Sequence, residues 1–271
     1  MFELFQYSFV LRGLEAGLLI GIIAPLIGIF LVLRRYSLIA DTLSHVCLTG
    51  IAIGLLLKIN PLFTAIGAAS ISSLAIERLR ISKKIYAETA LSIFLSGSLA
   101  LAIVLISFAH GFNVDIFSFL FGSIVTVKQA DIYTILVLSL IIAIILGAFY
   151  KELVYISFDE EAAQVSGIPV KLFNNIFILL AAIFIALAIP IVGILLVSAM
   201  LVIPVVTALQ LKKSFKATLL WAEVFSLASV LSGIVASFYL NLSSGGTIVL
   251  FMLAIFGIVF LFKDKKYISG K

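Results

Sequence analysis

No charged residue occurs between Lys171 and Lys212, where residues 172–211 read LFNNIFILLAAIFIALAIPIVGILLVSAMLVIPVVTALQL. An α-helix needs about 20 apolar residues to cross a hydrocarbon layer of about 30 Å. Because the stretch is about twice that long, we expect it to cross a membrane twice, or to cross once and re-enter. We place the break near Ile189 and Pro190, since proline lacks a backbone donor and disfavours helix in the residue before it.

The rest of the chain has the same apolar character. Of 271 residues, 63% are hydrophobic and 11% are charged, whereas soluble domains are about 45–50% apolar and about 25% charged. Further apolar segments occupy residues 13–33, 38–57, 61–76, 90–109, 132–150, 219–240 and 247–262. These runs are continuous and do not alternate, which argues against a membrane β-barrel. We expect an all-α, polytopic transmembrane bundle of eight or nine spans, forming one domain over residues 1–271, with residues 114–127 as a candidate re-entrant or half-length helix.

The composition also excludes several classes of protein. No stretch is polar enough for a soluble enzyme, a secreted disulfide scaffold or a nucleic-acid-binding domain. The single cysteine, Cys47, cannot form an internal disulfide. The G-x-x-x-x-G-K-[ST] loop that holds nucleotide phosphates is absent from the sequence. If ATP is used, another subunit must bind it, and we expect no cofactor in this chain.

The net charge of +5 indicates topology, not an anionic partner such as nucleic acid. With nine crossings and the N-terminus outside, every lysine and arginine except Arg12, Lys58 and Lys128 falls on the cytoplasmic side. The positive-inside rule predicts this bias, and the opposite orientation would invert it. We therefore expect residues 151–171 and the C-terminus to lie in the cytoplasm.

Asp41, Ser44 and His45 form the first polar constellation, inside the second apolar segment. Ionisable groups within a membrane helix are costly and usually face a cavity or a partner. Residues four apart lie one turn above each other on a helix, so Asp41 and His45 share a face. Carboxylate and imidazole are both ligands for zinc, manganese or iron, with a hydroxyl as support. The spacing therefore predicts a labile metal site of Asp41 and His45, supported by Ser44.

The structural alternative for this constellation is that Asp41 pairs with Arg34 or Arg35 and that His45 is a packing residue. It is weakened because no other Asp and His lie together in an apolar segment. Cys47 follows His45 by two residues and points to roughly the opposite side of the helix, so we interpret it as structural.

Residues 158–169, FDEEAAQVSGIP, form the second constellation. Three acids followed by small residues, then Gly167 and Pro169, predict a short helix with negative charge at its start and a glycine C-cap. A docking element for a partner and a plain solvated loop are both compatible with this pattern.

His110 and Asp115 follow the fourth apolar segment on the outer side. They are a candidate entry site for a cation. Loop residues of this kind are usually only solvated, so both interpretations stay open.

Several motifs together resemble the membrane subunits of the metal-cation ABC importers, the zinc and manganese permeases. The stretches that carry the resemblance run in the family's order over nearly the whole chain. They are GIFLVLRR at 28–35, IADTLSH at 39–45, AETA at 87–90, FGSI at 121–124, the segment 158–169, and VGILLVSA at 192–199 followed by Ile203 and Pro204.

The resemblance implies a homodimer of permeases with a pathway along the dimer axis, in the cytoplasmic (inner) membrane of a prokaryote. Two ATP-binding subunits would dock on the coupling helices, and an extracytoplasmic metal-binding protein would deliver the ion. By position, Asp41 and His45 match residues that line the metal path. The ATPase contact matches Asp159, Glu160, Glu161, Ala162, Gln164, Gly167 and Pro169.

The expected function is that of a non-enzymatic permease subunit of an ATP-driven importer of divalent transition metal ions. We place zinc ahead of manganese and iron, although any site of nitrogen and oxygen ligands binds zinc more tightly than manganese, so selectivity between them depends on geometry and on the delivering protein. One alternative is an ABC permease for a metal chelate such as a siderophore or corrinoid, but a chelated metal offers no open positions to Asp41 and His45. Another is an ATP-independent secondary cation transporter, which would usually show inverted repeats and several ionisable residues near the midplane.

Overall fold

The computed structural model describes residues 7–82, 85–108, 116–123, 125 and 127–268. Within these ranges the chain forms twelve helices and no strand, which confirms the all-α prediction. The helices are α1 (Ser8–Leu33), α2 (Ser37–Leu56), α3 (Pro61–Ile81), α4 (Ala87–Phe108), α5 (Ile116–Phe121), α6 (Gln129–Ala148), α7 (Tyr150–Phe158), α8 (Glu160–Val165), α9 (Val170–Val192), α10 (Val197–Leu209), α11 (Phe215–Leu240) and α12 (Ser244–Ile268).

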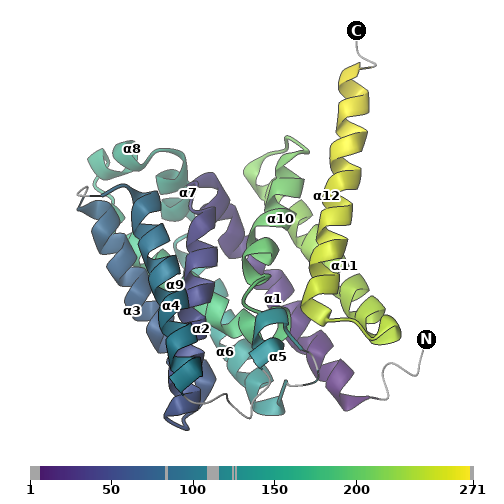
Figure 1. Ribbon diagram of the computed structural model, residues 1–271. Coiled ribbons are helices and arrows are strands. Elements are labelled where there is room, and N and C mark those ends of the chain that lie inside the picture. Colours follow the sequence, from purple (N-terminus) through teal and green to yellow (C-terminus); the bar gives the residue numbers. More distant parts are fainter. Residues whose placement is uncertain (1–6, 83–84, 109–115, 124, 126, 269–271) are drawn as a thin grey trace.

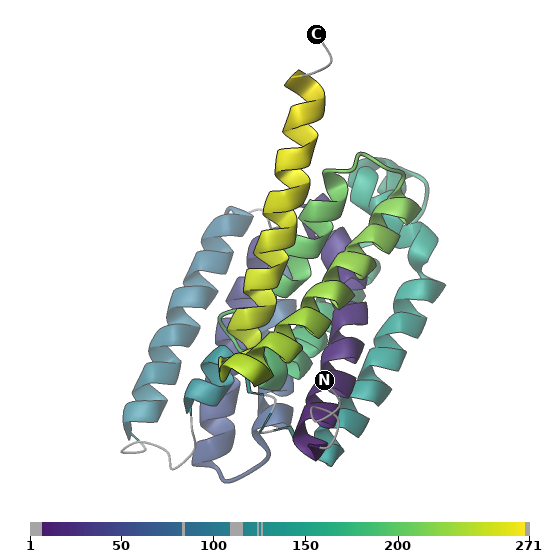
Figure 2. The same ribbon diagram turned by 90° about the vertical axis from the view of Figure 1, so that its right-hand side faces the viewer.

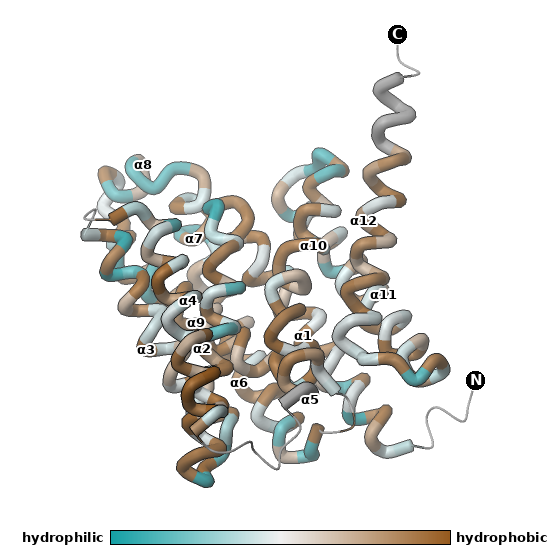
Figure 3. Tube along the Cα trace, viewed as in Figure 1, coloured by the Kyte–Doolittle hydropathy of each residue, from teal (hydrophilic) through white to brown (hydrophobic). Residues whose placement is uncertain are grey.

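Eight of the described helices are long and apolar enough to cross a membrane: α1, α2, α3, α4, α6, α9, α11 and α12. They form a bundle in which α12 projects beyond its neighbours at the end that also carries α8 (Figures 1 and 2). Hydrophobic residues cover most of the helices, while hydrophilic residues gather around α8 and at helix connections (Figure 3). This distribution is the one expected for a bundle in hydrocarbon with wetted ends.

Helix α9, whose one charged residue is Lys171 near its start, lies at the centre of the bundle. It packs against α1, α2, α3, α6 and α12, and its Phe177, Phe184 and Ile185 are fully buried. The outer helices instead expose large apolar side chains, such as Val104 on α4 and Ile144 on α6. Helices that are apolar all round are typical of membrane spans, because lipid replaces water on their outer faces.

The break in the long apolar stretch falls later than the sequence predicts. Helix α9 continues through Pro190 and ends at Val192, and Gly193 has φ of +90°. A proline is tolerated within a membrane helix. The Pro190 carbonyl, in the last turn of α9, accepts a hydrogen bond of 3.1 Å from the Ser123 N–H. The prediction near Ile189 and Pro190 is therefore wrong by a few residues, because the glycine conformation ends the helix and the proline does not.

Polar groups from α5 and α12 bind the backbone of this turn. The carbonyls of Phe119 and Leu120 accept hydrogen bonds from the N–H groups of Ile194 and Leu195, at 2.9 and 3.2 Å. At the start of α12, the Ser244 hydroxyl donates to the Ile191 carbonyl at 3.3 Å. Irregular backbone at membrane depth requires such internal partners, because lipid supplies none. We call this contact of α5, the α9–α10 turn and the start of α12 the α5 junction.

Helix α5 has six residues, as expected of a half-length element within 114–127, of which residues 114, 115, 124 and 126 lie outside the described ranges. Helix α10 has 13 residues, a length of about 20 Å at 1.5 Å per residue. The start of α1 and the end of α12 lie at opposite ends of the bundle (Figure 1). Eight described helices are long enough to span a membrane, and α10 is a shorter apolar helix between α9 and α11.

Candidate functional site

Helix α2 carries the predicted metal ligands on its one open stripe near its start. Asp41 and His45 are partly exposed, while Ala40, Leu43 and Ser44 are fully buried. The stripe continues to Leu38, which is 55% exposed. Both predicted ligands therefore reach the same surface of the chain, one turn apart.

Neither of these side chains is engaged in the way that the structural alternative requires. Asp41 forms no ion pair with any lysine or arginine in the described part of the chain. The Arg34 guanidinium binds Ser157 and Asn174 instead, at 2.9 and 2.8 Å. The Nδ1 atom of His45 is buried and has no hydrogen-bond partner among the described residues. An unsatisfied buried polar atom costs about 1–3 kcal/mol, a cost that a ligand reaching this nitrogen would relieve.

The neighbouring polar residues have different surroundings. The Ser44 hydroxyl donates to the Asp41 backbone carbonyl at 2.7 Å, so it binds the helix backbone beside the two ligands. Cys47 is fully buried and its Sγ faces the Ala65 carbonyl of α3 at 4.0 Å, on another side of α2, as a structural cysteine would be. His110 and Asp115 lie outside the described residues.

One copy of the chain brings two candidate metal ligands, Asp41 and His45, to this place. The described residues contain no group of three or more His, Cys, Asp or Glu that could hold a metal ion. Zinc sites usually need three or four protein ligands. A complete coordination shell therefore requires water, a second copy, or both.

The second predicted site forms the helix that the sequence indicates. The Asp159 side chain accepts from the Ala162 N–H at 2.8 Å and so caps the start of α8. At the other end, Gly167 has φ of +86°, and the Ile168 and Gly167 N–H groups donate to the carbonyls of Ala163 and Gln164 at 3.1 Å each. This is the Schellman arrangement of a glycine C-cap.

A small apolar core anchors α8 to its neighbours. Ile156 of α7, Ala163 of α8 and Val170 of α9 are buried together. On the outer side Val165 is 90% exposed, and Glu161 and Gln164 are exposed as well. Pro169 precedes the first residue of α9. Helix α8, which we call the docking helix, thus packs against α7 and α9 on one face and is exposed on the other.

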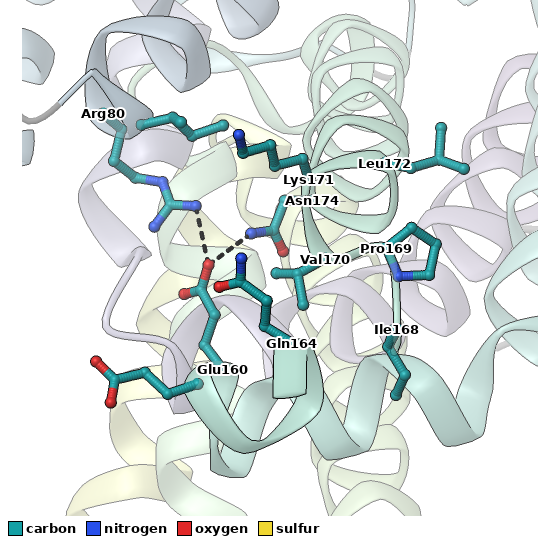
Figure 4. Close-up of a pocket in the computed structure, with 11 residues that line it drawn as sticks. Arg80, Glu160, Gln164, Ile168, Pro169, Val170, Lys171, Leu172 and Asn174 are labelled. Atoms are coloured by element: carbon teal, nitrogen blue, oxygen red, sulfur yellow. Dashed lines mark hydrogen bonds and ion pairs between the residues drawn. The ribbon is translucent and has the colours of Figure 1, made fainter. Parts of the chain in front are cut away.

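Glu160 differs from the other acids of this segment, because its carboxylate points back toward the bundle (Figure 4). Its Oε1 lies 3.1 Å from Asn174 Nδ2 of α9 and 3.5 Å from an Nη of Arg80 of α3. These residues line a groove of about 910 Å³ between α8, the end of α3 and the start of α9.

Sequence reasoning did not predict the cluster of Arg34, Glu77, Arg80 and Asn174, since it considered Arg34 as a partner of Asp41 and Arg80 as a topology marker. Glu77 is fully buried and forms a two-point ion pair with Arg80, three residues later. An acid and a base at that spacing near the end of an apolar span is the signal that could have found this pair. Burial lowers the pKa of Arg34 to about 10, which leaves it protonated at neutral pH, and burial raises the pKa of Tyr36 to about 12.

Comparison with known proteins adds to this geometry. The profile of the ABC 3 transport family matches residues 6–263. The chain is 34% identical over 97% of its length to the manganese transport system membrane protein MntC of Listeria monocytogenes, covering 94% of that protein. It is 28% identical over 93% of its length to the high-affinity zinc uptake system membrane protein ZnuB of Haemophilus influenzae, covering 98% of it.

A solved structure has the same fold. PsaBC from Streptococcus pneumoniae, in complex with Fab, matches with a TM-score of 0.85 and 30% identity, covering 95% of this chain and 92% of that chain. The arrangement of the spans, and the short elements between them, is therefore shared with that protein.

Proposed function

The chain belongs to the ABC 3 transport family, and from this premise we propose that it is the membrane-spanning permease subunit of an ATP-driven importer of a divalent transition metal ion. The observation that carries the proposal is the pair of Asp41 and His45 on the open stripe of α2, with the His45 Nδ1 atom unpartnered. An N/O pair without thiolate suits a labile site, from which cargo must leave again.

The two ligands of one chain leave coordination positions open, and a homodimer fills them. A twofold axis beside α2 would bring a second Asp41 and a second His45 to the same ion. Four N/O ligands can replace the water that the ion loses when it leaves an extracytoplasmic binding protein. The site then lies on the dimer axis, where the pathway is symmetric.

The energy source is a separate ATP-binding subunit, because the chain has no nucleotide-binding loop of its own. The exposed side of the docking helix, with Glu161, Gln164 and Val165, offers the contact surface. The chain itself is a transport subunit and performs no hydrolysis.

The orientation that we propose places the α8 end of the bundle in the cytoplasm. Arg34, Arg35, Arg78 and Arg80 are near that end, at the close of α1 and α3, whereas Lys58 and Lys128 are at opposite-end connections. This charge bias follows the positive-inside rule. The membrane is the cytoplasmic membrane of a prokaryote.

The ion is a divalent transition metal, and both zinc and manganese fit the ligands. Relatives named for each metal match along most of their length. Zinc binds N/O ligands more tightly than manganese, so selection between them depends on geometry and on the delivering protein. Transport must therefore be measured for both metals and for iron.

The test reconstitutes the permease with its ATPase in liposomes, adds the binding protein, and supplies Zn²⁺, Mn²⁺ or Fe²⁺. We expect ATP-dependent uptake of one ion. In Asp41→Asn and in His45→Ala that uptake should fall by about tenfold or more, because losing even a residue that supports a metal ligand lowers metal affinity or activity by about 10–100-fold. Glu15→Gln is the matched control, because Glu15 is an exposed acid in another span.

Three outcomes would contradict the proposal. Unchanged uptake in both ligand variants would remove the site. Uptake without ATP would favour a secondary transporter, and uptake of a metal chelate in place of the free ion would favour a chelate permease.

A further inference from the structure

A polar cluster connects the docking helix to the turn between α1 and α2. Asn174, which is 2% exposed, lies between its two ends. Its Oδ1 accepts from Arg34 at 2.8 Å, and its Nδ2 donates to Glu160 at 3.1 Å. The opposite amide orientation would set NH₂ against guanidinium and C=O against carboxylate, so Asn174 joins one cation and one anion in a single way.

Arg80 makes a second connection between the same two places. It pairs with buried Glu77 through two contacts of 2.6 and 2.8 Å, and it reaches Glu160 at 3.5 Å (Figure 4). Its guanidinium carbon lies 5.1 Å from the centre of the Tyr36 ring. A planar fork that can bind two carboxylates and stack on an aromatic ring is specific to arginine.

Arg34 anchors the other end of the cluster. Besides Asn174, it donates to the Ser157 hydroxyl at 2.9 Å and to the Leu153 carbonyl at 3.3 Å, both on α7. Its guanidinium carbon lies 4.9 Å from the centre of the Phe177 ring of α9. Two arginines and two glutamates balance the charge of the cluster, as partly buried charges require.

The turn at the end of this cluster leads directly into the helix with the predicted metal ligands. The Tyr36 N–H donates to the Leu31 carbonyl at 2.7 Å, and Arg35 has φ of +59°. Helices α1 and α2 are therefore joined by a tight, hydrogen-bonded turn of three residues. Helix α2 begins at Ser37, and Asp41 lies in its second turn. A displacement of residues 34–36 is therefore passed to α2 and not absorbed by a loop.

We propose that Arg34, Asn174, Glu160 and Arg80 form a mechanical link that fixes the docking helix to the start of α2, so that movement imposed on α8 moves Asp41 and His45. The inference rests on the proposed function and adds the route of coupling within this chain. Glu160 is a positioning residue of the link, facing the bundle, while Glu161, Gln164 and Val165 face outward.

The test measures metal uptake and ATP hydrolysis together, in the complete complex of permease, ATPase and binding protein. In Glu160→Gln we expect equilibrium binding of Zn²⁺ or Mn²⁺ within about twofold of wild type, and about tenfold less metal transported per ATP hydrolysed, which corresponds to about 1.4 kcal/mol. Glu152→Gln removes an acid from α7 outside the cluster and serves as the matched control.

A paired substitution separates the link from a general loss of structure. Asn174→Asp alone sets two carboxylates against each other and should uncouple as Glu160→Gln does. The double variant Glu160→Gln/Asn174→Asp keeps the net charge and restores the hydrogen bond with its direction reversed, so metal per ATP should return to within about twofold of wild type. Such a rescue measures coupling between the two residues directly.

Arg80→Lys keeps the charge but loses the fork, and should also uncouple transport; it serves as the second variant if Glu160→Gln does not assemble. Wild-type metal per ATP in Glu160→Gln, or a double variant that stays as impaired as the single ones, would overturn the link. Those results would leave wild-type uptake and the Asp41→Asn defect intact. Failure of the proposed function would instead abolish metal uptake in the wild-type complex itself.

Discussion

At the scale of single residues, His45 and the polar cluster behind α8 differ in whether neighbouring groups form hydrogen bonds with their polar atoms. His45 keeps a buried nitrogen without a partner in the described chain, while every polar group of the cluster behind α8 is bonded. Unsatisfied polar atoms in a folded protein tend to mark places where a ligand acts. The contrast agrees with the proposed roles, cargo binding for His45 and helix positioning for the cluster.

Asp159 illustrates a residue whose contribution is local. Its side chain caps α8 through the Ala162 N–H, and loss of such a cap costs about 0.5–2 kcal/mol. We expect Asp159→Ala to weaken binding of the ATPase to the permease by about fivefold, since about 1 kcal/mol is about a factor of five. Titration of the ATPase against the reconstituted permease measures this change.

Asp159→Asn is the control for that experiment, because asparagine caps helices about as well as aspartate. If Asp159→Asn weakens binding as much as Asp159→Ala, the carboxylate charge and not the cap is responsible.

At the scale of helices, the α5 junction decides how the long apolar stretch folds back. Gly193 adopts a φ of +90°, and a Cβ there would overlap the backbone of Leu120 and Gly122. Only glycine takes such a conformation readily, and strain of this kind costs about 1–3 kcal/mol per residue. The depth at which α9 ends therefore depends on one missing methyl group.

We expect Gly193→Ala to lower the thermal stability of the detergent-solubilised protein and its yield of folded material, because both the strain and the overlap must be relieved. Gly97→Ala, in α4, is the matched control, since no atom lies within 4 Å of a Cβ placed there. Alanine favours a helix interior over glycine by about 1 kcal/mol, so this variant should be as stable as wild type or more so. Equal melting temperatures for the two variants would contradict our account of the junction.

At the scale of the whole molecule, the topology places α8 and the α2–α3 turn at opposite ends of the bundle (Figure 1). Thiol labelling can test this topology in the native sequence. The one native cysteine, Cys47, is fully buried, so we expect little labelling of it. In intact cells, a membrane-impermeant thiol reagent should label Lys58→Cys but not Val165→Cys.

After permeabilisation both variants should react, since Val165 is 90% exposed. Labelling of Val165→Cys in intact cells, with Lys58→Cys protected, would show that the orientation is inverted.

The sequence by itself determined the membrane class, the eight long apolar spans, the short helix α8 with its glycine cap, and the placement of Asp41 and His45 on one helix face. These properties depend on local rules, namely apolar length, helical spacing and capping chemistry, which operate within a few turns of the chain. The family resemblance, now shown by the match over residues 6–263, likewise rested on short motifs in order.

Only the tertiary structure decided where α9 ends, that α10 is a separate helix of 13 residues, and that Glu160 faces the bundle. Arg34 meets Asn174 across 140 positions of sequence, and Glu160 meets Arg80 across 80. No local pattern encodes which of several arginines near one end of a bundle will be buried against a given acid. That choice follows from the packing of α1, α3, α7 and α9, since each partly buried charge must find its partner among the side chains that packing brings within reach.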